Sequence, residues 1–245
     1  YGVKLPSIDE LASKIVAYSN HIKPFIKDTN EILWNAIDND KKILLEGAQG
    51  SMLDIDHGTY PFVTSSNTIS AGACSGSGIS PRDIGEVIGI AKAYCTRVGK
   101  GYFPSEDFGK DGERLQKNGF EFGTTTGRAR RCGWFDAVAC KYAIRLNGVT
   151  SLALMKLDVL SGFDSIKVCI GYKKDGKELT TFPYSLDKVD PIYKEFEGFD
   201  DVSGVREFDK LPKKAQEYIL GLEQILEIKI SIISTSPERD DVIKR

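Results

Sequence analysis

The 245-residue chain has few of the side chains from which metal sites, disulfide frameworks and catalytic triads are built. Its two histidines are His21 and His57, and its five cysteines are irregularly spaced with no C-x-x-C pair. An odd number of unpatterned cysteines argues against a disulfide scaffold and a structural zinc site, and two histidines exclude a histidine-rich metal site. We therefore expect a cytoplasmic protein with no metal ligands in this chain.

Charge of one sign and long apolar runs are also missing. Lys and Arg total 33 and Asp and Glu total 35, a net charge of -2, which argues against a general nucleic-acid binder or a protein of acidic membrane surfaces. No apolar run approaches the length of a membrane span. The start at Tyr1 has neither an initiator methionine nor the apolar core of a signal peptide, so we expect the chain to begin inside a longer protein.

Apolar side chains at helical spacing predict several helices. A capping box at Ser7 and Glu10 begins the first, and Pro24 should end it. Ser80-Pro81 supplies an N-cap followed by a proline at the first helical position. The predicted helices run from Ser7 to Pro24, from Thr29 to about Ile37, from Ser80 through Ala91, from Phe135 to Gly148 and from Leu211 to Ile228.

Short apolar and β-branched runs predict strands at Lys42–Glu46, Ser151–Met155, Ile166–Tyr172 and Lys229–Ile233. Asp175-Gly176 is a strong hairpin signal after the third of them. The alternation of helices and strands predicts an α/β fold with a largely parallel central sheet flanked by helices and a β-hairpin excursion. Ligands of such folds bind beyond the carboxyl ends of the strands, so the loops 46–68, 156–158 and 234–237 are expected to share one face.

The segment from Gly123 to Arg131 has the sequence GTTTGRARR. Glycine lets backbone N–H groups approach an oxyanion, hydroxyls donate hydrogen bonds, and guanidinium groups bind carboxylate or phosphate in a fork. The pattern indicates an anion site, and a mobile, solvated basic turn is an alternative of equal weight. It is not a Walker A loop, because G-x-x-x-x-G-K-[ST] occurs nowhere in the chain.

Lys156-Leu157-Asp158 follows the second predicted strand directly, where a nucleotide base could bind. A carboxylate there can accept hydrogen bonds from N1–H and the exocyclic amine of guanine, whereas adenine presents an acceptor at N1. A surface ion pair is the alternative for so short a pattern. Ser234-Thr235-Ser236-Pro237 follows the last strand and could be a simple turn, and the Gln49 amide could read a purine edge or stabilise its own loop.

Asp54, Asp56 and His57 form a D-x-D-H cluster that invites a metal interpretation. Asp and His also serve hydrogen bonding within loops, and magnesium usually takes one or two carboxylates together with phosphate. His57 could instead be a general acid. No nucleophile–base pair lies beside it in the sequence, so a catalytic triad is not supported.

Several of these segments together resemble adenylosuccinate synthetase, the family that joins IMP and L-aspartate at the expense of GTP in the first committed step from IMP to AMP. The resemblance spans about residues 40 to 240 and implies a P-loop-NTPase-like fold. The matching segments, in chain order, are Glu46–Pro61 (EGAQGSMLDIDHGTYP), Val63–Thr68 (VTSSNT), Thr96–Gly99 (TRVG), Gly123–Trp134 (GTTTGRARRCGW) and Lys156–Leu160 (KLDVL).

The resemblance implies a role for individual residues. Those expected to contact IMP are Gln49, Thr64 and Arg128. Those expected to hold aspartate are Thr124, Thr125, Thr126, Gly127, Arg128, Ala129 and Arg130. Those expected to contact GTP are Arg130, Lys156, Leu157, Asp158, Ser234, Thr235 and Ser236. The family usually has Ser-Thr-Gly-Pro at this last site, so Ser236 replaces a glycine that lets the backbone approach the base.

The resemblance also implies what this chain lacks. The family's phosphate loop, its aspartate base and magnesium ligand, and its histidine acid lie in an N-terminal half that nothing here matches. We therefore expect the C-terminal part of one domain, made of a helical lead-in (1–40), a binding core (41–160) and a hairpin, helix and final strand (161–245). Magnesium, GTP as co-substrate and a homodimer are implied, and the isolated chain is expected to be inactive. A non-catalytic nucleotide-binding module is the alternative.

Overall fold

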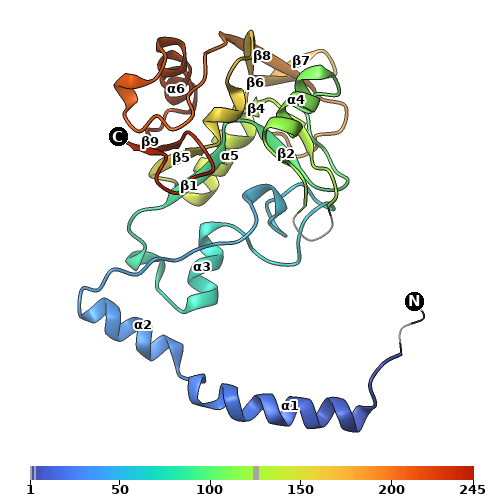
Figure 1. The fold of residues 1–245 in the computed structure, drawn as a ribbon, viewed down its shortest axis with the longest axis vertical. Helices are drawn as coiled ribbons and strands as arrows, with labels where there is room; N and C mark the ends of the chain where they lie inside the picture. Colours follow the sequence, from blue (N-terminus) through green and yellow to red (C-terminus); the bar gives the residue numbers. More distant parts are fainter. Residues whose placement is uncertain (1, 3, 124–126) are drawn as a thin grey trace.

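The computed structural model describes residue 2, residues 4–123 and residues 127–245 (Figure 1). The α-helices of this part are α1 (Ile8–Ile22), α2 (Thr29–Asp38), α3 (Ser70–Ser77), α4 (Lys110–Asn118), α5 (Ala137–Asn147) and α6 (Lys213–Leu226). Its strands are β1 (Ile88–Lys92), β2 (Cys95–Arg97), β3 (Arg131–Gly133), β4 (Phe135–Asp136), β5 (Ser151–Met155), β6 (Ser165–Lys174), β7 (Lys177–Leu179), β8 (Asp190–Glu197), β9 (Ile230–Ser234) and β10 (Val242–Lys244).

The central sheet has the strand order β1-β5-β9-β10 within the described residues. β1, β5 and β9 are parallel, and β10 is antiparallel to β9. Leu152, Ala153 and Leu154 in β5 are all buried, as expected for a parallel strand that is covered on both faces. The predicted α/β fold with a largely parallel sheet is confirmed.

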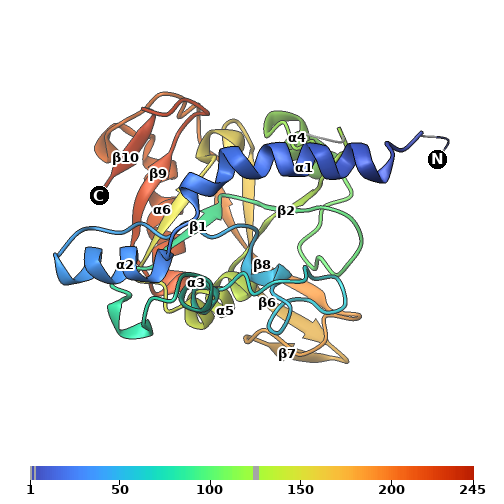
Figure 2. The same ribbon diagram turned by 90° about the horizontal axis from the view of Figure 1, so that it is seen from below.

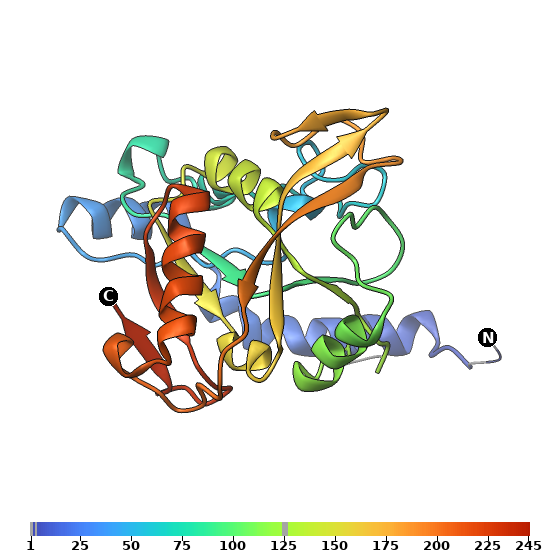
Figure 3. The same cartoon turned by 90° about the horizontal axis from the view of Figure 1, so that it is seen from above.

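The hairpin excursion is built on β6, which is parallel to β4 and antiparallel to β7 and β8. Its turn contains Asp175 at φ 49° and Gly176 at φ 78°, the left-handed pair that suits the twist of a two-residue hairpin. The predicted strand and hairpin are confirmed. Figure 3 shows the ribbon of β6 and β8 extending away from α6.

The hydrophobic core lies between α6, the central sheet and the residues that follow β5 (Figure 3). Trp134 is buried, packs edge-to-face on Phe163 with ring centroids 5.4 Å apart, and donates from Nε1 to Asp107 at 3.1 Å. The face of α6 that enters this core consists of Ala215, Tyr218, Ile219, Leu222 and Leu226. The amphipathic pattern predicted this helix correctly.

The N-terminal helices differ from the rest in burial. Ser7 caps α1 by accepting from the Glu10 N–H at 3.2 Å, as predicted, yet in the described chain α1 buries none of its side chains. Figure 1 shows α1 lying apart from the body. α2 is fixed to the turn after α3, because Trp34 Nε1 donates to the Gly78 carbonyl at 3.1 Å. None of the described helices has the length and apolar character needed to cross a membrane.

The predicted helix from Ser80 through Ala91 is wrong. Pro81–Asp83 is a 3₁₀ turn capped by Ser80, and the chain then enters β1. The apolar positions fit a helical spacing, but glycines within the segment disfavour a helix. Gly89 also faces β5 closely: a Cβ there would lie 2.8 Å from a Leu152 methyl and 2.9 Å from a Val149 methyl, so a larger residue would displace these side chains.

The predicted strand at Lys42–Glu46 is also wrong, since the described chain has no strand there and Leu44 is 88% exposed. A strand needs a neighbouring strand for its hydrogen bonds, and β1 pairs only with β5 in the described sheet. The predicted shared face therefore holds for the loops 156–158 and 234–237, which follow β5 and β9. The loop 46–68 lies instead against α5, where Tyr142 Oη donates to the His57 carbonyl. Figure 2 gives the view from below.

Two leucines of α6 test the assignment of the core. Leu222 is fully buried, and Leu220 is 41% exposed on the same helix. We expect Leu222→Ala to lower the free energy of unfolding by about 2–5 kcal/mol, because it removes buried methyl groups and leaves a cavity. Leu220→Ala, the matched control, should cost much less. Urea unfolding of both variants measures the difference, and equal losses would contradict this packing.

Candidate functional site

The loop predicted to bind anions, Gly123–Arg131, begins and ends in two short antiparallel segments, 121–122 and 129–130, which we call the foot of the loop. Phe122 and Ala129 form a β-bridge, and the Arg130 N–H donates to the Glu121 carbonyl at 2.8 Å. Nearer the tip, the Gly123 N–H donates to the Arg128 carbonyl at 2.8 Å, and Gly127 has φ 62°. Gly127, Arg128 and Ala129 are exposed. The predicted aspartate contacts Thr124, Thr125 and Thr126 lie outside the described residues.

The carboxylate of Glu121 lies fully buried at the base of this loop. Its Oε2 accepts from Arg130 Nη1 at 2.7 Å. Its Oε1 accepts from Tyr94 Oη at 2.5 Å, Lys92 Nζ at 2.8 Å and Lys156 Nζ at 3.1 Å. We call these five side chains the Glu121 cluster. It joins the foot of the loop to the carboxyl ends of β1 and β5.

The local backbone explains why Glu121 points inward. α4 ends at Asn118, with Gly119 as its C-cap, and Phe120 takes a left-handed φ of 49°. This turns the chain so that Phe120 is 84% exposed and Glu121 is buried. Gly119 also makes room for the cluster, because a Cβ there would lie 2.2 Å from Tyr94 Oη. An alanine at this position would push the Tyr94 hydroxyl away from Glu121.

The Glu121 cluster is positively charged. Burial raises the pKa of Glu121, but hydrogen bonds from Lys92, Tyr94, Arg130 and Lys156 outweigh burial and lower it to about 2. Burial lowers the pKa of Lys92, and the bond to Glu121 opposes that shift. Among the described side chains, three cations therefore share one carboxylate. Such an excess of positive charge suits an anionic ligand.

The carboxyl ends of β5 and β9 meet beside this cluster. Lys156 takes a left-handed φ of 63°, and its N–H donates to Ser234 Oγ at 2.8 Å. Its ammonium group donates to the Gly119 carbonyl at 2.6 Å as well as to Glu121. Leu157 is fully buried and belongs to the core. The structure thus brings together the predicted residues Arg130, Lys156 and Ser234.

Asp158 differs from Glu121 in having a buried carboxylate oxygen without a hydrogen-bond donor in the described part of the chain. Its Oδ1 is buried and meets no hydrogen-bond donor among the described residues. Burial is the main cause that raises the pKa of this carboxyl. A buried acceptor without a donor is costly. The side chain is therefore suited to a ligand that brings N–H donors with it.

The loop after β9 is tied together by side chains. Thr235 Oγ1 donates to the Val205 carbonyl at 2.8 Å. Ser236 Oγ donates to Asp241 Oδ2 at 2.6 Å, and Arg206 Nε donates to Asp241 Oδ1 at 2.9 Å. The hydrogen bonds from Ser236 and Arg206 lower the pKa of Asp241. The Ser236 hydroxyl thus points back into its own loop.

Gln49 and Thr64, both predicted to contact IMP, are neighbours in the structure. Gln49 Nε2 donates to Thr64 Oγ1 at 3.3 Å, and Ser66 Oγ donates to Gln49 Oε1 at 3.5 Å. Gln49 has a left-handed φ of 69°. Gln49 and Thr64 are 15 positions apart in the sequence, and the fold of the loop between them brings their side chains together. The two side chains can therefore contact one ligand.

Asp54 organises that loop. It is fully buried and accepts from the backbone N–H groups of Asp56, His57, Thr68 and Ile69. Burial raises its pKa, but these four bonds outweigh burial and lower it overall. In the described ranges no group of three or more His, Cys, Asp or Glu side chains is arranged to hold a metal ion. Of the two interpretations of this segment, loop hydrogen bonding accounts for Asp54.

Arg131, the last arginine of the GTTTGRARR segment, has a structural role. Its guanidinium group forms a fork with the Glu106 carboxylate and donates from Nη1 to the Gly101 carbonyl at 2.8 Å. It holds the 99–101 turn against β3. Of the three arginines, Arg131 is therefore directed away from the Glu121 cluster.

Lys92, Tyr94 and Glu121 are site residues that sequence reasoning missed. In the segment Phe120-Glu121-Phe122 both phenylalanines are exposed and the acid between them is buried. The signal that could have found Glu121 is its position two residues before Gly123, beside a loop with three arginines and no acidic residue.

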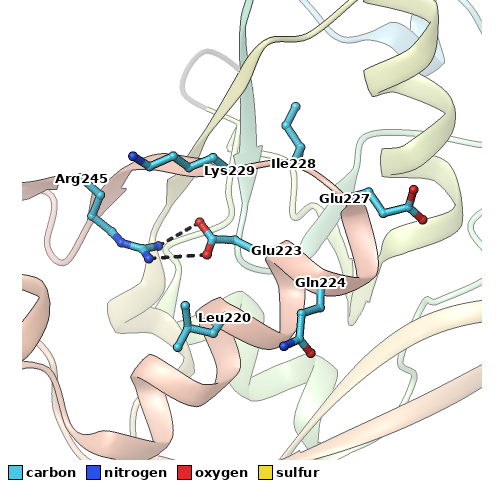
Figure 4. Close-up of a pocket in the computed structure, with 7 residues that line it drawn as sticks. All are labelled: Leu220, Glu223, Gln224, Glu227, Ile228, Lys229 and Arg245. Atoms are coloured by element: carbon cyan, nitrogen blue, oxygen red, sulfur yellow. Dashed lines mark hydrogen bonds and ion pairs between the residues drawn. The ribbon is translucent and has the colours of Figure 1, made fainter.

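A hollow of about 540 Å³ lies elsewhere, between the end of α6 and Arg245 (Figure 4). Glu223 crosses it to Arg245, with Oε1 2.9 Å from Nη1, and also accepts from the Ile230 N–H at 2.7 Å. This is the amino end of β9, whereas the Glu121 cluster lies at the carboxyl ends of the strands. The hollow does not contribute to the candidate site.

Comparison with known proteins identifies the family. The profile of the family described as Adenylosuccinate synthetase matches residues 2–243. The chain belongs to the adenylosuccinate synthetase family. It is 60% identical to the adenylosuccinate synthetase of Wolinella succinogenes over 245 residues and 61% identical to that of Helicobacter hepaticus over 243 residues. These matches cover 100% and 99% of this chain, and it spans 59% of the length of each relative.

Solved structures agree with this assignment. A fully ligated adenylosuccinate synthetase from Plasmodium falciparum matches 99% of this chain with a TM-score of 0.94 and 38% identity, and the match covers 59% of that protein. The succinoaminodeoxyadenylate synthetase of cyanophage S-2L matches 89% of this chain and 50% of its own, with a TM-score of 0.56 and 20% identity, and shows likeness of fold alone. The α/β architecture is thus that of the adenylosuccinate synthetase family.

The depressed pKa of Glu121 predicts how stability depends on pH. The folded-state pKa of about 2 lies below the ordinary 4.5, so the ionised carboxylate stabilises the fold above pH 4.5, and this contribution is lost as the pH falls towards 2. We expect the difference in unfolding free energy between the original protein and Glu121→Gln to shrink steadily over that range. Urea unfolding between pH 7 and pH 2 measures it. A difference that stays constant would show that Glu121 is not ionised in the fold.

Proposed function

We propose that this chain is the substrate-binding part of a GTP-dependent adenylosuccinate synthetase, which ligates IMP and L-aspartate and releases GDP and phosphate. The observation that carries the proposal is the shared edge of β5 and β9. There the buried Asp158 Oδ1, which meets no donor within the described residues, lies two residues after Lys156, whose ammonium group belongs to the positive Glu121 cluster. A carboxylate acceptor beside several cations fits a guanine nucleotide, which presents N–H donors and negative charge together.

The proposal assigns each ligand to a group of side chains. Gln49, Thr64 and Arg128 bind IMP, and their support is the hydrogen-bonded pair Gln49–Thr64. The loop residues Thr124, Thr125, Thr126, Gly127, Arg128, Ala129 and Arg130 bind the carboxylates of L-aspartate. Lys156, Leu157, Asp158, Ser234, Thr235 and Ser236 bind the guanine end of GTP, with Arg130 also near this nucleotide. Leu157 would contribute its backbone, because its side chain is buried in the core.

In this proposal the chemistry follows the family reaction. The γ-phosphoryl group of GTP passes to O6 of IMP, the amine of aspartate then forms a bond to C6, and phosphate leaves as the amine loses a proton. Positioned arginines favour such a step because negative charge gathers on the transferring phosphoryl group. The residues of this chain bind and orient, and the base and acid are expected outside it.

Magnesium, the homodimer, the cytoplasmic location and the single-domain organisation are further parts of the proposal, and their support is the family. The described residues do not fit a magnesium site. The oxygens of Asp54 accept from four backbone N–H groups, and Asp56 Oδ2 accepts from Asn67 Nδ2 at 2.7 Å. We derive no step through the metal from this chain.

A coupled assay tests the function. The protein expressed from the complete reading frame that encodes this chain is supplied with IMP, L-aspartate and GTP, and it is expected to form adenylosuccinate and GDP in equal amounts. The isolated 245 residues are expected to bind ligands without turnover. Omitting L-aspartate is the control. A complete protein that binds GTP and IMP yet forms no adenylosuccinate would instead indicate a non-catalytic nucleotide-binding module.

The guanine assignment predicts a change in nucleotide selectivity. Asp158→Asn replaces an acceptor oxygen with an amide donor, so we expect KM for GTP to rise roughly tenfold to a hundredfold, the range for a lost hydrogen bond to a charged group, and the preference for GTP over ATP to fall. Asp164→Asn, the same substitution at an exposed neighbour, is the matched control. Steady-state kinetics with both nucleotides decide the question, and unchanged selectivity would refute the role of Asp158.

A further inference from the structure

The proposed guanine site has two walls that follow different strands. One wall is the 3₁₀ turn after β5, which contains Asp158, and the other is the loop 234–237 after β9. The Lys156 N–H donates to Ser234 Oγ at 2.8 Å and joins the walls at their base, where the two strands are neighbours. Both walls extend beyond this edge, so the bond at the base does not by itself fix how far apart they stand.

The segment 201–206 contacts both walls. Its Val202 N–H donates at 3.3 Å to the hydroxyl of Ser161, the residue that caps the 3₁₀ turn after β5. Its Val205 carbonyl accepts from Thr235 Oγ1, in the loop after β9, at 2.8 Å. Val202 and Thr235 are both fully buried. The segment is therefore anchored in the core at the points where it meets each wall.

An ion pair strengthens the second of these contacts. Asp241 Oδ1 accepts from Arg206 Nε at 2.9 Å, and Arg206 Nη2 lies at 2.9 Å from the same oxygen. On the other side, Asp241 Oδ2 accepts from Ser236 Oγ at 2.6 Å, and the Asp241 carbonyl accepts from the Thr235 N–H at 3.0 Å. Asp241 thus ties the loop after β9 to the end of the segment 201–206.

We propose that Asp241 and Arg206 are positioning residues that set base selectivity: their pair holds the loop 234–237 at a fixed distance from Asp158, so that the 2-amino group of guanine is recognised. This inference rests on the proposed function and deepens it, because it assigns selectivity to residues that act through the loop. Asp158 can accept from both N1–H and the exocyclic amine only when the base has one orientation. Such geometry depends on the bonds that support the site.

Calorimetry on the complete protein tests this inference. The dissociation constants of GDP and of inosine diphosphate (IDP) are measured with saturating IMP, which keeps IDP out of the IMP site. The two nucleotides differ only in the 2-amino group of the base, and we expect the unaltered protein to prefer GDP. In Arg206→Met and in Asp241→Asn this preference should fall roughly threefold to tenfold, the range for one weakened hydrogen bond, because the contact with the amine serves GDP alone.

Lys214→Met is the matched control. Lys214 is 54% exposed, close to the 60% of Arg206, and it also forms an ion pair at 2.9 Å, but its partner is Glu197 at the end of β8. This variant should leave both dissociation constants unchanged. A purely structural role of the Arg206–Asp241 pair predicts a lower Tm with an unchanged preference for GDP, and that result overturns the inference. Equal weakening of GDP and IDP overturns it as well, because it indicates that Arg206 contacts the phosphates.

Two further outcomes are decisive. If Asp241→Asn does not fold, Arg206→Met carries the test, because it replaces an exposed side chain. If both variants fold, the double variant should change the preference no more than either single one, and additive effects overturn the inference because the two residues then act separately. An unaltered protein that binds GDP no more tightly than IDP contradicts the proposed guanine site, and the inference fails with it. A preference for GDP that both variants keep contradicts the inference alone.

Discussion

Burying the carboxylate of Glu121 imposes a constraint that much of the site satisfies. A charge removed from water is tolerated only when charged or polar donors surround it. Here the donors come from the end of β1, from the foot of the 123–131 loop and from the end of β5. The left-handed Phe120 and the close approach at Gly119 follow from the same requirement, because they let the acid turn inward and let Tyr94 reach it. The loop is thus built outward from a buried ion pair.

Parallel strands do the remaining positioning. β5 and β9 are neighbours that run in the same direction, so their following loops meet, and the Lys156 N–H bonds to Ser234 Oγ across that edge. Ser236 in this chain adds a bond to Asp241, which Arg206 also holds. The hydroxyl therefore strengthens the loop from inside.

The sequence was informative where one local rule decided the structure. Apolar runs predicted β5 and β9, the Asp175-Gly176 pair predicted the hairpin, and the spacing of apolar residues predicted α5 and α6. The sequence was misleading from Ser80 to Ala91, where apolar residues with helical spacing belong partly to a strand. The contact of Gly89 with β5 is a tertiary interaction that local spacing does not reveal. The strand expected at Lys42–Glu46 needed a partner that no local pattern reveals.

The candidate site divides in the same way. Patterns of charge and hydroxyl groups indicated the 123–131 loop and the β5 edge, but no pattern indicated Glu121, which joins them. It stands between two phenylalanines in the sequence, and the structure buries the acid while both rings are exposed. The contact of Gln49 with Thr64 is likewise invisible until the loop between them is folded around Asp54. A single buried polar residue produces no periodic pattern in the sequence. Sequence patterns therefore indicate the charged residues around it more readily than the buried residue itself.

The two tryptophans give the protein a built-in pair of optical reporters. Trp134 is enclosed in the core beside Phe163, whereas Trp34 is 52% exposed on α2 and donates from Nε1 to the Gly78 carbonyl in the turn after α3. Their emission therefore differs in colour and in access to a soluble quencher. Blue-shifted, protected fluorescence follows the integrity of the sheet, and red-shifted, quenchable fluorescence follows the attachment of the N-terminal helices, so one spectrum distinguishes loss of the lead-in from loss of the fold.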